Sequence, residues 1–186
     1  MDQSLNHVAL LVASLEKSIN FLSPFGFQMG EIDVFQSEGT REVYVESNFG
    51  NSLLLIEAFK KGPYKNALEK RGPGFHHLAL DVLNLDQFVD SLIGTGWFLH
   101  PFSFKSRKNF NTIFIARPGF PGLIEVRECN QILSKENFVN EVALNFGSPI
   151  EKMLGAIGLE KILRPTNENE TISLGVHRLE LKKITH

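Results

Sequence analysis

The sequence of 186 residues has little of several features that mark specialised protein classes. A single cysteine, Cys129, excludes an internal disulfide and is typical of a protein from a reducing compartment. The apolar run near the N-terminus, 8–13, is far shorter than the ~20 residues that span a bilayer. The polar start, 1–6, also lacks the basic segment of a signal peptide. We therefore expect a cytoplasmic protein with no membrane partner.

Neither sign of charge dominates the chain. It carries 19 Lys and Arg against 21 Asp and Glu, a formal net charge of −2. Nucleic-acid-binding proteins usually carry a basic excess, so we expect no nucleic-acid partner. A hydrophobic content of 42% and a charged content of 22% are ordinary for a soluble globular protein. The expected partner is a small-molecule substrate.

What the sequence does have is an internal repeat. The run His7-Val-Ala-Leu-Leu-Val returns as His77-Leu-Ala-Leu-Asp-Val, and apolar residues continue to match at an offset of 70. Alternating and helical spacings predict a strand, an amphipathic helix and further strands in each copy. The first copy is expected to have strands at 5–12, 41–46 and 52–59 and a helix at 14–22 capped by Ser14. The second is expected to have strands at 75–82, 111–116 and 123–127 and a helix at 85–93 capped by Asn84. With one more strand after each Gly-aromatic pair, the unit is strand-helix-strand-strand-strand.

The repeat divides the chain into a main domain, 1–130, and a C-terminal appendage, 131–186. The domain consists of modules 4–60 and 74–129 and a basic linker, 61–73. Residues 131–186 do not repeat the pattern; a helix is expected at 149–159 and a strand at 172–184. We expect the appendage to pack on the main body or on a partner subunit, with a plug in the active cleft as an alternative.

Each copy begins with a histidine and ends with an acid, both in apolar strands. Glu57 follows His7 by 50 residues and Glu125 follows His77 by 48. A carboxylate in an apolar strand is costly unless it is paired or binds a cation. Two imidazoles and two carboxylates suit one divalent first-row metal, expected as Co, Ni, Zn, Mn or Fe, with His7, Glu57, His77 and Glu125 as ligands. The other histidines are interpreted as structural or surface residues: His76, His100, His177 and His186.

These features resemble the vicinal oxygen chelate superfamily, which includes glyoxalase I, extradiol dioxygenases, methylmalonyl-CoA epimerases and antibiotic-binding resistance proteins. The resemblance covers roughly residues 4–129. It implies an α+β fold of two tandem βαβββ modules, forming a curled mixed sheet around a metal cleft. The four predicted ligands match the family's ligand positions, with Glu57 reached through a small gap. Leu55 is the ungapped match, and it cannot bind a metal.

Within that superfamily the chain looks most like methylmalonyl-CoA epimerase. The run Leu68-Glu-Lys-Arg-Gly-Pro-Gly-Phe-His-His-Leu-Ala is similar to that family's linker and third-ligand motif, and Glu42 falls where those epimerases place a catalytic acid. The resemblance implies epimerisation of a 2-substituted acyl-CoA through a metal-stabilised enolate, with Glu42 and Glu125 as acid–base groups. Basic linker residues would then meet a CoA phosphate: Lys60, Lys61, Lys65, Lys70 and Arg71.

Three other functions stay open. A glyoxalase I-like lactoylglutathione lyase resembles the same order of ligands. An extradiol-type dioxygenase needs only two His and one carboxylate, so Glu57 as a fourth ligand argues against it. A non-catalytic binding protein of the same fold typically lacks the ligands. We therefore expect a metal-dependent isomerase or lyase, for which a homodimer is compatible.

Overall fold

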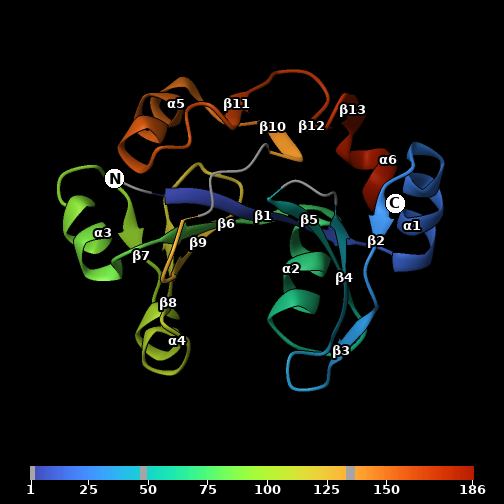
Figure 1. Cartoon of the computed structure of the whole chain (residues 1–186), viewed down its shortest axis with the longest axis horizontal. Coiled ribbons are helices and arrows are strands. Elements are labelled where there is room, and N and C mark those ends of the chain that lie inside the picture. Colours follow the sequence, from blue (N-terminus) through green and yellow to red (C-terminus); the bar gives the residue numbers. More distant parts are fainter. Residues whose placement is uncertain (1–2, 47–49, 133–136) are drawn as a thin grey trace.

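The computed structural model describes residues 3–46, 50–132 and 137–186, and both repeats join one nine-stranded sheet (Figure 1). The first module consists of β1 (Gln3–Val12), α1 (Leu15–Leu22), the 3-10 turn η1 (Ser23–Phe25), β2 (Gln28–Met29), β3 (Asp33–Phe35), β4 (Thr40–Glu46) and β5 (Ser52–Ala58). The linker carries α2 (Pro63–Arg71). The second module consists of β6 (Gly74–Val82), α3 (Leu85–Ser91), β7 (Phe98–Leu99), α4 (Ser103–Phe110), β8 (Thr112–Ala116) and β9 (Leu123–Glu128). The predicted mixed α+β fold is confirmed.

The two modules are related by a pseudo-twofold axis between β1 and β6. These central strands pair antiparallel, while β1 pairs parallel with β5 and β6 pairs parallel with β9. Both predicted caps are confirmed: Ser14 Oγ accepts a hydrogen bond from the Lys17 amide and Asn84 Oδ1 from the Gln87 amide. The sequence did not predict β3 or α4. None of the helices formed by the described residues has the length and apolarity to cross a membrane.

The C-terminal unit, residues 137–186, forms a second sheet in the order β11-β10-β12-β13. Its elements are β10 (Val139–Leu144), α5 (Ser148–Leu154), the 3-10 turn η2 (Gly155–Ile157), β11 (Leu163–Pro165), β12 (Thr171–Leu174), β13 (His177–Glu180) and α6 (Leu181–Thr185). The predicted helix at 149–159 corresponds to α5 and η2. The predicted strand at 172–184 is instead a hairpin and a helix, because the chain turns at Gly175, whose φ of 56° favours glycine.

Different parts of the chain cover the two faces of the main sheet. Along β1, Val8 and Leu10 belong to one large core that also contains buried side chains of the C-terminal unit. Ala9 and Leu11 face the other way and pack with side chains of α2. Figure 1 shows the C-terminal elements on one side of the sheet and α2 on the other. Because His7 shares the face of Ala9, the C-terminal unit does not plug the face that carries His7.

The C-terminal unit packs on both modules of the main body. Its buried apolar side chains join the same core as the central strands. Asn51, which is 3% exposed, bonds the backbone of Val139 through both amide atoms, at 2.7 and 3.0 Å. Ser18 donates to the Ile184 carbonyl, and the Trp97 indole to the Met153 carbonyl. The predicted packing on the main body is therefore seen in the structure.

Candidate metal centre

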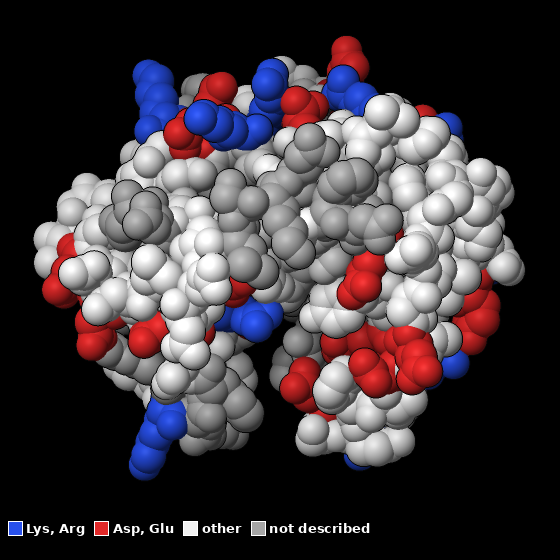
Figure 2. Space-filling model, viewed as in Figure 1, with Lys and Arg blue, Asp and Glu red and all other residues white. Residues whose placement is uncertain are grey.

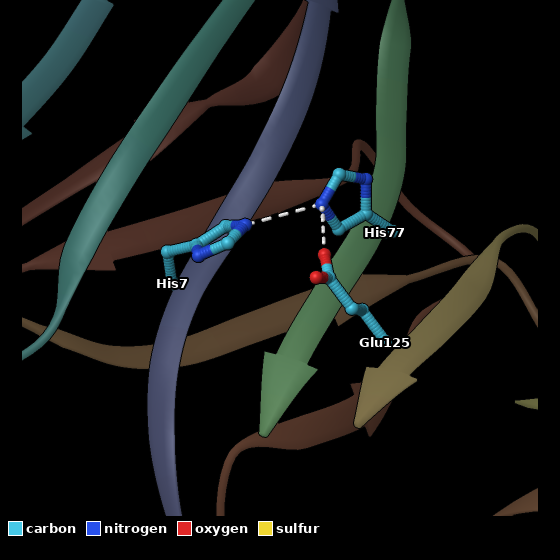
Figure 3. A group of neighbouring side chains, drawn as sticks. All are labelled: His7, His77 and Glu125. Carbon is cyan, nitrogen blue, oxygen red and sulfur yellow. Dashed lines mark hydrogen bonds and ion pairs between the residues drawn. The ribbon is translucent and has the colours of Figure 1, made fainter. Parts of the chain in front are cut away.

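Three of the four predicted ligands meet at the centre of the sheet. His7 Nε2 lies 3.1 Å from His77 Nε2, and His77 Nε2 lies 3.3 Å from Glu125 Oε2. One donor atom from each of the three residues lies within 4.8 Å of the others. Figure 3 shows the two rings and the carboxylate converging from three different strands.

The register of the strands places these side chains together. His7 on β1 pairs with Ala79 on β6, and Ala79 pairs with Glu125 on β9. His77 pairs with Ala9 on the same central ladder. The small side chain of Ala79 thus lies between His7 and Glu125, and that of Ala9 lies beside His77, so the larger polar side chains converge above the alanines.

Burial at His7, and the contact with His77 at Glu125, keep the donor atoms in forms that can bind a metal. Burial, followed by the charge of His77, lowers the pKa of His7 to about 3, so this imidazole is neutral at physiological pH. Burial alone would raise the pKa of Glu125, but the hydrogen bond and charge of His77 outweigh it and lower that pKa. Glu125 is therefore a carboxylate. A neutral imidazole and an ionised carboxylate are the forms that coordinate cations.

The geometry fits one small divalent ion. Two ligand atoms that each lie about 2.1 Å from an ion, at a right angle, are about 3 Å apart. The separations of 3.1 and 3.3 Å between donor atoms are close to that value. His7, His77 and Glu125 could hold the ion and leave its other positions to substrate or water.

Glu57 does not join this group, and its predicted role as a ligand needs correction. One of its oxygens accepts a hydrogen bond from the Leu15 amide at 2.7 Å, and both lie 2.9 Å from Arg41 Nη2. The carboxylate therefore sits at the start of α1, where it satisfies a free backbone N–H and the helix dipole. Its charge is compensated by Arg41 instead of a metal.

The second module shows why the sequence misled at Glu57. Val12 pairs with Glu57, and its repeat mate Val82 pairs with Glu128, whose carboxylate likewise accepts from the first amide of α3. The last strands are therefore related by an offset of 71 residues, one more than the 70 between His7 and His77. By the same register Leu54 is the mate of Glu125, since Ala9 pairs with Leu54 and Ala79 with Glu125. The fourth place is apolar, and it falls at Leu54 instead of Leu55.

Glu42 lies on the same face of the sheet as the three donors. It pairs with Ile56 of β5, which pairs with Leu11 of β1, two positions beyond Ala9. Burial, with smaller contributions from Glu38 and Asp33, raises the pKa of Glu42, although Thr40 donates a hydrogen bond of 2.7 Å to its carboxyl. Figure 2 shows the molecule hollowed on the side away from the C-terminal unit, with acidic side chains gathered on one wall.

The predicted phosphate-binding residues are solvated. Lys60, Lys61, Lys70 and Arg71 are exposed, and Lys65 is half-buried. Arg71 donates to the Pro121 carbonyl at 2.7 Å, which joins the linker to the second module.

Comparisons with known proteins agree with this architecture. A sequence model of the Glyoxalase/Bleomycin resistance protein/Dioxygenase superfamily matches residues 6–114. A hypothetical protein from Bacillus halodurans C-125 has 19% identity and a TM-score of 0.59, over 74% of this chain and 100% of that one. Methylmalonyl-CoA epimerase from Mycobacterium tuberculosis has 26% identity and a TM-score of 0.51, over 67% and 86%. A variant of the Streptomyces coelicolor epimerase in complex with 2-nitronate-propionyl-CoA has 19% identity and a TM-score of 0.50, over 67% and 97%. No curated protein matches the chain.

Proposed function

Because the matched segment makes up more than half of the chain, the chain belongs to the Glyoxalase/Bleomycin resistance protein/Dioxygenase superfamily, and we propose that it is a metal-dependent epimerase of a 2-substituted acyl-CoA. The observation that carries the proposal is the convergence of His7, His77 and Glu125, with Glu42 on the same face. The 26% identity to methylmalonyl-CoA epimerase supports the choice of reaction. In this proposal the three converging residues hold the ion.

The reaction requires a weakly acidic proton to leave the carbon beside a thioester. A bound divalent metal supplies Lewis-acid stabilisation of the developing negative charge on the thioester oxygen. Glu42 is the proposed base, because its raised pKa makes it a stronger proton acceptor than an exposed glutamate. The rate at which the proton beside the thioester exchanges with solvent should therefore rise with pH as Glu42 ionises.

Glu125 comes from the second module and is the proposed second acid–base group. Its lowered pKa keeps it ionised, so it would accept the C2 proton of one epimer while protonated Glu42 returns a proton to the opposite face of the carbon. In the reverse direction Glu42 accepts the proton and Glu125, protonated by the previous turnover, returns one. We therefore assign Glu125 first to the metal and second to proton transfer. The exposed linker cations are the proposed contacts for a CoA phosphate.

Deuterium exchange at C2 of methylmalonyl-CoA tests this function. The Co²⁺-loaded chain in D₂O is expected to exchange the C2 proton, and Glu42→Gln to slow exchange by ~100-fold or more while keeping the metal. Glu46→Gln, on the same strand and exposed, is the matched control and should exchange at the wild-type rate. Metal-loaded wild type that exchanges no proton would rule out the epimerase.

One observation favours a second candidate. With Leu54 in the fourth place, the donors are two histidines and one carboxylate, the set typical of non-haem Fe(II) oxygenases. Glu57, a fourth ligand that would disfavour an extradiol-type dioxygenase, is not at the site. A chain loaded with Fe(II) and given catechols should consume oxygen if this candidate is correct. Without oxygen uptake, the dioxygenase is dismissed.

A further inference from the structure

The central ladder contains two β-bulges at matching places. On β1 the pairing passes from Leu5 directly to His7, so Asn6 is the extra residue. On β6 it passes from Phe75 directly to His77, so His76 is the extra residue. Each bulge thus falls on the residue just before a predicted metal ligand. Bulges re-aim side chains that would otherwise alternate between faces.

The first bulge places the amide of Asn6 against His7. Asn6 Oδ1 lies 2.8 Å from His7 Nδ1 and accepts a second hydrogen bond from Arg127 at 3.2 Å, while Asn6 Nδ2 donates to Asp81 at 2.7 Å. These contacts fix which end of the amide faces the ring. Since an amide oxygen can only accept, His7 Nδ1 must donate. In the neutral ring, Nε2, which faces His77, then carries the lone pair that a metal needs.

The second bulge places a different side chain, the imidazole of His76, against His77. His76 Nδ1 lies 2.8 Å from His77 Nδ1, so one ring donates and the other accepts. The His76 ring also packs against Tyr64 of α2 in a tilted arrangement, with centroids 5.0 Å apart and planes 31° apart. Tyr64 of the linker helix α2 therefore contacts His76, and His76 in turn contacts His77.

We infer that Asn6 and His76 are a duplicated pair of positioning residues, which hold the His7 and His77 rings in the orientation that a divalent ion requires, and that Asn6 also fixes the tautomer of His7. The inference rests on the metal centre of the proposed function and adds the groups behind its ligands. Histidines that bind metals usually bond through their other ring nitrogen to such a partner, and losing the partner typically costs about 10–100-fold in affinity. Asn6 and His76 differ in side chain, but both contact Nδ1 of the histidine that follows them.

Isothermal titration calorimetry of the metal-free protein with Co²⁺ measures the affinity for the ion and tests the inference. His76→Phe keeps a ring beside Tyr64 but loses the hydrogen bond, and Asn6→Leu keeps the size of the side chain; each should weaken Co²⁺ binding by roughly 10–100-fold. His76→Asn copies the first module and should recover most of the affinity. Asn51→Ala removes two hydrogen bonds to Val139 and is the stability control, with Co²⁺ affinity unchanged.

The histidine ¹⁵N NMR spectrum of the metal-free protein adds a readout that a structural role would not move. His7 should be protonated at Nδ1 in wild type and should become a mixture of tautomers in Asn6→Leu. Folded His76→Phe and Asn6→Leu proteins that bind Co²⁺ as tightly as wild type would overturn the inference. If wild type binds no divalent ion, the proposed function fails, and the tautomer of His7 still decides the role of Asn6.

Discussion

Two buried imidazoles make the protein sensitive to acid. Burial, followed by the charge of His77, lowers the pKa of both His7 and His76 to about 3. In the unfolded chain each would titrate near its ordinary value of about 6.5. Between these values the unfolded state binds more protons than the folded state, so stability is complete above about pH 6.5 and falls as the pH drops towards 3.

Each of these histidines should therefore contribute a slope of up to about 1.4 kcal/mol per pH unit to the unfolding free energy of the metal-free protein near pH 5. His7→Phe and His76→Phe should each reduce the slope, and the double variant should reduce it further. Urea unfolding between pH 4 and 7 measures this. An unchanged slope in both variants would contradict the neutral, buried state of these rings.

At the scale of elements, the sequence predicted what the repeat controls and missed what breaks it. The constant offset of 70 residues predicted the central strands and both capped helices. It also predicted that His7 and His77 lie close together. It failed in β5, where the offset becomes 71 and Glu57 matches Glu128. The spacing from Glu125 to Glu128 was the available signal, since Leu54 precedes Glu57 by the same three residues.

Other features of the fold have little or no signal in the sequence. The bulge at Asn6 depends on the pairing of two strands, which no single stretch of sequence reveals. In the C-terminal unit, β10 and β11 are short and repeat nothing, and only Gly175 marked the hairpin that replaced one predicted strand. Non-local pairing decides these features, so local periodicity could not predict them.

The place of Leu54 opposite Glu125 gives a prediction at this scale. Leu54 is 4% exposed, so Leu54→Glu buries a carboxylate and should lower the stability of the metal-free protein by about 3 kcal/mol. A bound ion would compensate that charge, so Zn²⁺ should raise the melting temperature more in this variant than in wild type. Thermal unfolding with and without Zn²⁺ measures the difference.

Leu55→Glu is the matched control for that experiment. Leu55 is fully buried in the core on the other face of β5. Its substitution should destabilise the chain at least as much, with no extra rescue by Zn²⁺. Equal rescue of both variants, or of neither, would contradict the assignment of Leu54 to the fourth place.

At the scale of the whole molecule, one core joins the C-terminal unit to both modules. The apolar face of β1 and β6 that carries Val8, Leu10, Leu78 and Leu80 is covered from that side by residues beyond 137. The opposite face, which Ala9 and Leu11 share with His7, packs against α2, and the molecule is hollowed on the side away from the C-terminal unit (Figure 2). The C-terminal unit thus packs on the sheet without occupying the face that carries the candidate metal centre.

Truncation after residue 130 should therefore expose apolar surface and not release activity. We expect a chain that binds the dye ANS and aggregates in size exclusion, because exposed core drives association. A folded, monomeric truncated chain with raised exchange activity would show instead that the C-terminal unit is an inhibitory plug.

The metal content of the purified chain tests the central claim most directly. Elemental analysis of wild type is predicted to find one divalent ion per chain, which His77→Ala and Glu125→Ala lose and Glu57→Ala keeps. Glu57→Ala should be less stable by about 1 kcal/mol, because it removes a helix cap and an ion pair. Wild type without any ion after incubation with Co²⁺, Ni²⁺ and Zn²⁺, or a Glu57→Ala chain that loses its ion, would contradict the three-residue centre.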